Sequence, residues 1–256
     1  MKSRAATIAR YTLLEALRTR LPAIVLIVLA LTVAAGFFVE QIAVTEGVRF
    51  RTGFYAAAAR WATVFIVALH VIAAVAREFD DKVLDVLLAL DLPRSHYVLG
   101  RLAGFAAVAA IIAAVACVPL AWSVSAGALA QWGTSLAVEL AIVAALALFC
   151  AITFTQLVPA AGFVAAFYIL ARALTAMRLI SANPISGADV LSHQVMGVVV
   201  EGLALILPGL ESWTKTDWLV NQPAAWATLA VIVAQGALYI ALLAGAAMFD
   251  LHRKNF

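Results

Sequence analysis

The sequence predicts an all-α, polytopic membrane protein that crosses a bilayer six times. Of its 256 residues, 66% are apolar and only 12% are charged, and the mean hydropathy is +1.05. So few charges could not cover the surface of a soluble domain this apolar. The apolar residues run continuously through each long stretch, which favours helices over the alternating strands of a β-barrel. We therefore treat residues 1–256 as one transmembrane domain.

Six stretches are long enough to span a membrane, since a helix needs roughly 20 residues to cross the hydrocarbon core. They are residues 21–39, 54–76, 102–125, 134–157, 160–180 and 224–248. A seventh apolar stretch, 195–210, is short, contains Glu201 and ends at Pro208-Gly209, which is typical of a re-entrant or interfacial helix. Residues 181–223 are therefore expected to form an outer region with a helical insertion between spans five and six.

The cations predict the orientation. With six spans, both termini and the loop after the second span lie on one side, which holds eleven cations: Lys2, Arg4, Arg10, Arg18, Arg20, Arg77, Lys82, Arg94, Arg101, Arg253 and Lys254. The other side holds five, Arg49, Arg51, Arg60, Arg178 and Lys215. Because positive charge stays inside, both termini should be cytoplasmic.

Residues 1–20 have a helical pattern of their own. Ala6, Ala9, Leu13, Ala16 and Leu17 tend to one face, and Arg4, Glu15 and Arg18 lie opposite. This pattern predicts an amphipathic elbow helix on the inner membrane surface that leads through Pro22 into the first span. The alternative is a cleaved signal peptide, for which Ala34-Ala35 would be the cleavage site.

The loop at 77–97 interrupts the apolar segments with an amphipathic helix. Its apolar positions recur at three- and four-residue intervals, namely Leu84, Leu87, Leu88 and Leu92. Glu78, Asp80 and Asp81 fall in its first turn, where carboxylates suit the helix dipole, and Pro93 ends it. Two interpretations remain, a membrane-surface helix and a ball-and-socket helix that inserts into a groove of an ATPase.

Catalytic motifs are missing from the chain. There is no phosphate-binding loop, H-E-x-x-H, C-x-x-C or G-x-S-x-G, and the four histidines are scattered over different elements. Cys117 and Cys150 both fall inside spans, where they are expected to pack as small apolar residues. We therefore expect no enzyme, no catalytic residue, no metal site and no cofactor in this chain, and no nucleic-acid partner.

Residues 77–101 resemble the cytoplasmic loop of type-2 ABC transporter permeases, which typically reads R-E-x-E-x-G-T-L-E-x-L-L before a proline, an arginine and a Gly-Lys or Gly-Arg. The matching positions are Arg77, Glu78, Asp80, Leu84, Asp85, Leu87, Leu88, Arg94, Gly100 and Arg101. The chain departs from the family at Lys82-Val83, where the family has Gly-Thr, and at Asp91, its usual proline position. The stretch at 207–220 is similar to the leucine-proline outer loop of a permease subfamily that is close to the nitrous-oxide reductase maturation permeases.

The resemblance implies an exporter-like assembly in the bacterial inner membrane. Two permease copies, as a homodimer or a heterodimer, would sit on two ABC ATPase subunits, and these partners would bind ATP and Mg. The coupling residues would be Arg77, Glu78, Asp81, Leu84, Leu87, Leu88, Pro93, Arg94 and Tyr97. Two rival functions remain, an ATP-independent secondary carrier and a non-transporting membrane scaffold that recruits a cytoplasmic protein.

Two charges fall inside predicted spans at similar depth, Glu139 in the fourth and Arg172 in the fifth. A charge near the bilayer centre costs about 2.5–3.5 kcal/mol, so both side chains should face protein or water. The pair could be a structural ion pair or a polar patch on a substrate path. Gly100 and Gly104 form a G-x-x-x-G, to which we give little weight because such spacings arise by chance in a chain rich in alanine and glycine.

Overall fold

The computed structural model describes residues 4–81, 93–182, 197–203 and 206–253. Six helices in this part are long and apolar enough to cross a membrane, with mean hydropathies of 1.8 to 2.6, so the chain fits a multi-pass membrane protein. They are α2 (Leu21–Ile42), α3 (Gly47–Asp80), α5 (Arg94–Cys117), α6 (Ala126–Phe154), α7 (Leu157–Ala182) and α10 (Trp226–Arg253). The shorter elements are α1 (Arg4–Arg18), η1 (Val118–Leu120), η2 (Leu210–Ser212) and α9 (Asp217–Val220).

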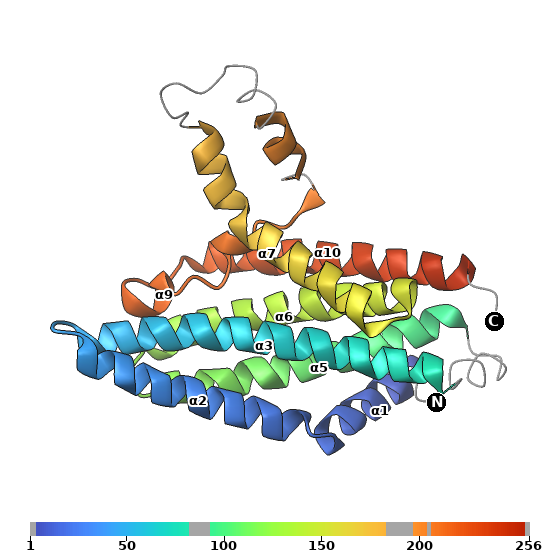
Figure 1. The fold of residues 1–256 in the computed structure, drawn as a ribbon, viewed down its shortest axis with the longest axis horizontal. Coiled ribbons are helices and arrows are strands. Elements are labelled where there is room, and N and C mark those ends of the chain that lie inside the picture. The colour runs from blue at the N-terminus through green and yellow to red at the C-terminus, as the bar shows by residue number, and fades with distance from the viewer. Residues whose placement is uncertain (1–3, 82–92, 183–196, 204–205, 254–256) are drawn as a thin grey trace.

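The helices alternate in direction along a common axis (Figure 1). The end of α3, the start of α5 and the C-terminal end of α10 lie at one end of the bundle, together with α1. The α2–α3 connection and α9 lie at the opposite end. Six crossings therefore bring the chain back to the end at which it started, and we call this end the terminal end.

Helix α6 is the centre of the bundle. It packs against α3, α5, α7 and α10, and 72% of its most apolar window is buried. By contrast, only 17% of the corresponding window of α2 is buried, and 22% of that of α10. Such exposed apolar helices suit contact with lipid, whereas polar side chains on α6 must find partners inside the protein.

Local sequence explains where the central helices begin and end. The side chain of Ser125 accepts a hydrogen bond from the backbone N–H of Ala128 and caps the start of α6. At the other end of α6, Thr155 has a left-handed backbone with φ 56°, which stops the helix and allows a tight reversal into α7. Pro22 lies in the first turn of α2, where its missing N–H costs nothing.

Helix α1 crosses the start of α5 at very short range. A Cβ atom at Gly100 would lie 2.7 Å from Ile8 Cβ, and one at Gly104 would lie 2.5 Å from Thr12 Cβ. Only glycine fits at such distances, so the G-x-x-x-G that we discounted in the sequence is the α1–α5 contact. The face of α1 that packs inward carries Thr12 and Ala16, whereas Leu17 of the expected apolar face is 46% exposed.

The region after α7 partly leaves the bundle. Figure 1 shows the C-terminal turns of α7 standing away from the other helices, with the short helix at 197–203 beside them. The chain then returns along the bundle, where Leu210, Trp213 and Trp218 are buried. This returning segment, residues 207–216, covers the polar groups described below.

Candidate functional site

Two groups of polar side chains lie inside the bundle, one at the terminal end and one near its middle. The first belongs to the described residues on either side of the predicted coupling loop. Leu84, Leu87 and Leu88 of that loop lie outside the described residues. The loop's flanks are described, and they carry the other six predicted coupling residues: Arg77, Glu78, Asp81, Pro93, Arg94 and Tyr97.

The flanks do not have the predicted helix boundaries. We expected an amphipathic helix to begin at Arg77, but α3 continues without a break to Asp80, with Asp81 as its C-cap. Glu78 and Asp80 therefore lie in a last turn rather than a first turn, where the helix dipole disfavours carboxylates. The buried ion pair of Glu78 with Arg101 offsets this cost. At the other flank, Pro93 precedes the first turn of α5.

Arg101 connects three helices at the terminal end, and we call its contacts the Arg101 junction. Its side chain is 6% exposed and forms ion pairs with Glu78 of α3 and with Glu15 of α1, the latter at 3.0 Å. Arg101 Nη1 also donates to Thr12 Oγ1 at 3.1 Å. Tyr97 Oη donates to Glu78 Oε2. The paired charges are opposite in sign and each helix contributes a side chain, so α1, α3 and α5 are held together at this end.

Two further arginines beside the loop have different surroundings. Arg94 Nη1 donates to the backbone oxygens of Leu251 at 2.7 Å and His252 at 3.2 Å, which joins the start of α5 to the last turn of α10. Arg77 is exposed and lines an open groove that also contains Glu15, Arg20 and His70. Arg77 is therefore the predicted coupling residue that faces this groove rather than the Arg101 junction.

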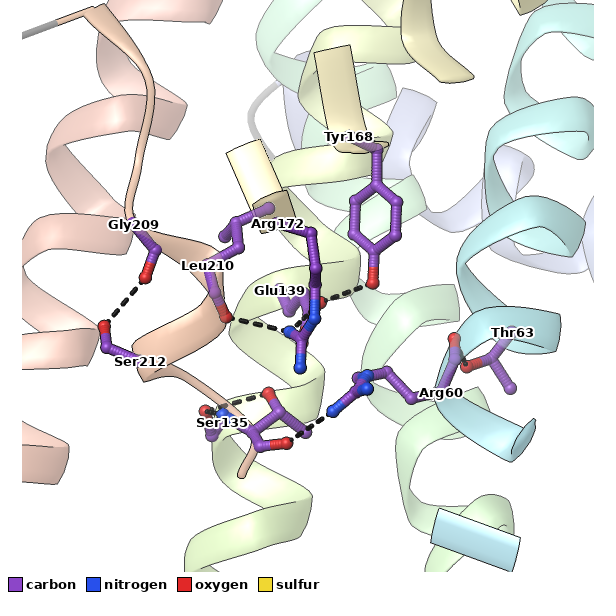
Figure 2. Close-up of polar contacts among 10 residues, drawn as sticks. Arg60, Thr63, Ser135, Glu139, Tyr168, Arg172, Gly209, Leu210 and Ser212 are labelled. Atoms are coloured by element: carbon purple, nitrogen blue, oxygen red, sulfur yellow. Dashed lines mark hydrogen bonds and ion pairs between the residues drawn. The ribbon is translucent and has the colours of Figure 1, made fainter. Parts of the chain in front are cut away.

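Glu139 is the centre of the second polar group (Figure 2). Its side chain is fully buried at 0% exposure. Arg172 Nη1 lies 3.3 Å from Glu139 Oε1, and Tyr168 Oη donates to the same oxygen at 2.8 Å. The structure thus brings together the two charges that the sequence placed at similar depth. Because α6 begins at Ala126 rather than at residue 134, Glu139 lies near the middle of its helix.

Arg172 and Arg60 both fasten the returning segment to the bundle. Arg172 Nη1 donates to the Leu210 backbone oxygen at 2.8 Å, and Arg60 Nη1 donates to the Thr214 backbone oxygen at 2.8 Å. Figure 2 shows the two guanidinium groups pointing toward one another from α7 and α3. Arg60 was expected among the cations on the outer side, but it is only 7% exposed and was not predicted as a site residue.

Thr214 is held in an unusual conformation. Its φ is 45°, a left-handed value that costs a β-branched residue energy. Its N–H donates to Ser135 Oγ at 2.9 Å, and the two hydroxyl oxygens lie 3.0 Å apart. With the bond from Arg60 to its carbonyl oxygen, every polar atom of Thr214 has a partner, so the surrounding contacts stabilise the strained backbone.

An open pocket of about 300 Å³ adjoins this group. Its wall carries three cations, Arg60, Arg172 and Lys215, and two carboxylates, Glu211 and Asp217. Three buried polar atoms of the group lack a hydrogen-bond partner, and they are Arg60 Nε, Glu139 Oε2 and Glu211 Oε2. We call the pocket and these side chains the Arg60 pocket. In the described part of the chain, no group of three or more His, Cys, Asp or Glu side chains could hold a metal ion.

Comparison with known proteins does not identify a family for this chain. No protein-family model matches this chain. No curated protein matches it significantly either.

Proposed function

We propose that this chain is the permease subunit of an ATP-driven transporter of the type-2 ABC class, with exporter-like operation. It would work in the bacterial inner membrane with both termini cytoplasmic, beside a second permease copy and two ATPase subunits. ATP and Mg would bind those partners and not this chain. The resemblance of residues 77–101 to the permease loop is the starting point of the proposal.

The Arg101 junction is the observation that carries the proposal. The loop follows Asp81 and ends at Pro93, and the residues on either side of it belong to α3 and α5. Glu78, Tyr97 and Arg101 join these two helices to each other and to α1 through buried, charge-assisted bonds. A displacement of the loop by a partner would therefore move three helices together, which is what a coupling element must do.

The bond between Arg94 and the end of α10 extends this argument. It attaches the fourth helix of the terminal end to the loop's second flank. A membrane scaffold that only recruits a protein has no need for such connections, because binding alone requires nothing of the spans. The carrier alternative needs no partner at the terminal end at all. The junction thus favours an externally driven permease over both rivals.

The test is co-purification from native membranes with the tagged full chain, followed by mass spectrometry. We expect an ATPase with a phosphate-binding loop at near one-to-one ratio. Leu87→Asp and Leu88→Asp should abolish its recovery while membrane insertion is unchanged, because a carboxylate cannot enter an apolar groove. Asp85→Asn changes the charge of the same segment on another predicted face and should leave recovery intact. Unchanged recovery with both leucine variants would refute this docking site.

A further inference from the structure

Arg60 is a buried cation that forms no ion pair with a carboxylate among the residues that the structure describes. Its side chain is 7% exposed, and no carboxylate in the described ranges lies within ion-pair distance of it. The nearby carboxylate Glu139 already accepts from Arg172 and Tyr168. A buried charge that lacks a partner is costly, and inside a membrane span it marks a functional site.

Most donors of the two guanidinium groups are unused. Among the described residues, Arg60 and Arg172 donate only through Nη1, to Thr214 and to Glu139 and Leu210 respectively, and Arg60 Nε is buried without a partner. Guanidinium groups present several N–H donors in a fixed fork that matches the two oxygens of a carboxylate or phosphate. Both groups line the Arg60 pocket, and Figure 2 shows them converging from different helices.

We propose that the Arg60 pocket binds an oxyanion group, a carboxylate or a phosphate, between the guanidinium groups of Arg60 and Arg172. The exposed ammonium group of Lys215, at the pocket wall, contributes a third positive charge. The oxyanion supplies the negative charge that balances the two arginines, because Glu139 is the one buried carboxylate between them in the described residues. This site does not depend on an ATPase partner, so its test is separate from that of the proposed function.

The acidic side of the pocket narrows the ligand further. Glu211 Oε2 is buried and has no hydrogen-bond donor, although Glu211 lines the same pocket as Arg60. A ligand with a hydroxyl or ammonium group next to its oxyanion would satisfy this oxygen. A bare oxyanion would leave it without a partner. The pocket therefore favours hydroxylated or aminated ligands over simple ones of equal charge.

Thr214 makes the site rigid. The strained residue fixes the Arg60 guanidinium through its carbonyl oxygen, so the donors are positioned before any ligand arrives. Preorganised donors lose little entropy on binding. Two tryptophans report on this region without labelling. Trp61 follows Arg60 and its ring lies 5.2 Å from that of Tyr168, whereas Trp213 precedes Thr214 and is buried.

The experiment titrates the purified full chain, in detergent without anionic lipid, with inorganic phosphate and separately with acetate. Tryptophan fluorescence is the readout, and sodium chloride at matched ionic strength is the reference. We expect a saturable, one-site change with either oxyanion. Arg60→Gln should weaken binding about tenfold or more, because a charged hydrogen-bonding group is lost. Arg49→Gln is the matched control, since Arg49 is exposed and pairs with Glu46 outside the pocket.

A second variant keeps the test decisive if Arg60→Gln does not fold. Lys215 is exposed, so Lys215→Gln should fold normally and weaken binding roughly threefold to tenfold. Phosphate binding equal to wild type in Arg60→Gln, or in Lys215→Gln if Arg60→Gln does not fold, would overturn the proposal. A wild-type response no larger than that to chloride would do the same. Equal weakening in Arg49→Gln would also overturn it, by showing non-specific attraction.

A lipid arm distinguishes the source of the oxyanion. The chain is reconstituted in nanodiscs of phosphatidylcholine with or without phosphatidylglycerol, and the phosphate titration is repeated. Loss of the phosphate response in phosphatidylglycerol, again dependent on Arg60, assigns the group to a lipid headgroup. An unchanged response assigns it to a soluble solute. Both results support oxyanion binding, whereas no response in either membrane or in detergent refutes it.

Discussion

The Arg101 junction and the Arg60 pocket both bury an arginine, but they treat its charge in opposite ways. Arg101 lies between two carboxylates, those of Glu15 and Glu78, and donates to Thr12 as well. Arg60 has one bond to a backbone oxygen and an unpartnered Nε. Groups whose partners are complete hold a structure together, whereas groups with spare donors are available to a ligand. The first region thus holds helices together, whereas the second has spare donors for the proposed oxyanion.

The largest predicted effect comes from removing the fully partnered arginine. Arg101→Met should destabilise the protein by about 3 kcal/mol, because it leaves the largely buried Glu78 carboxylate without a cation. Denaturant titration in detergent, followed by tryptophan fluorescence, measures this loss. The double variant Arg101→Met with Glu78→Gln should recover part of it, since only the more exposed Glu15 carboxylate then lacks its cation. A loss below about 1 kcal/mol would contradict the comparison.

The pair at the bundle centre should show an intermediate effect. Glu139→Gln removes the charge that faces Arg172 while keeping the shape of the side chain. A double-mutant cycle with Arg172→Gln should give a coupling energy of about 1–3 kcal/mol, because the two groups are buried and in contact. Thr63→Ser serves as a nearby control that alters no charge. A coupling energy near zero would mean that the two charges act independently.

An effect of similar size is expected from the contact between α1 and α5. Gly104→Ala places a Cβ where Thr12 already lies, and overpacking of this kind costs about 1–3 kcal/mol. Gly245→Ala is the matched control in α10, because nothing lies within 4 Å of its added Cβ. That control should be neutral or slightly stabilising, as alanine is the better helix former. The same denaturant titration compares the two variants.

The smallest change in the free energy of unfolding should come from Arg60→Met. This variant is the most direct test of the difference between Arg60 and Arg101. The variant loses the bond to the Thr214 carbonyl oxygen but no longer buries an unpaired charge, so the two changes oppose each other. We expect the free energy of unfolding to change by less than about 1 kcal/mol, or to rise. A loss as large as that of Arg101→Met would show that Arg60 is also a fastener. Arg60→Met is compared with wild type without added oxyanion.

The sequence was a good guide to the spans and a poorer one to their ends. The fourth predicted span, 134–157, starts late because Gln131 and other small or polar residues of α6 precede it, yet Gln131 is buried and donates to the Ala224 backbone oxygen. The second span extends from 54–76 to Gly47–Asp80, since its flanking arginines and carboxylates lie on helix and not in loops. Hydropathy finds membrane segments but not helix ends.

The matched depth of Glu139 and Arg172 could be read from the sequence because each position follows from counting along a helix. Arg60 could not be found in this way. Its burial depends on Thr214, 154 residues later in the chain, which returns over it in an irregular segment. The packing role of Gly100 and Gly104 could not be predicted from the sequence either, because it depends on how α1 crosses α5. Contacts between distant segments decide both cases, and no local pattern encodes them.

The attachment of α1 to α5 makes the first turns of the chain useful as a reporter. Because Arg101 and the two glycines hold α1 in place, a probe at the exposed Thr7 would follow the rotation of α5 rather than drift in the lipid. Arg94 attaches the last turn of α10 to the same helix. Spin labels at Thr7 and Arg253 should therefore keep a constant separation during transport. The separation between one label on α1 and another on α7 should change. Pulsed dipolar spectroscopy would reveal which helices travel as one body.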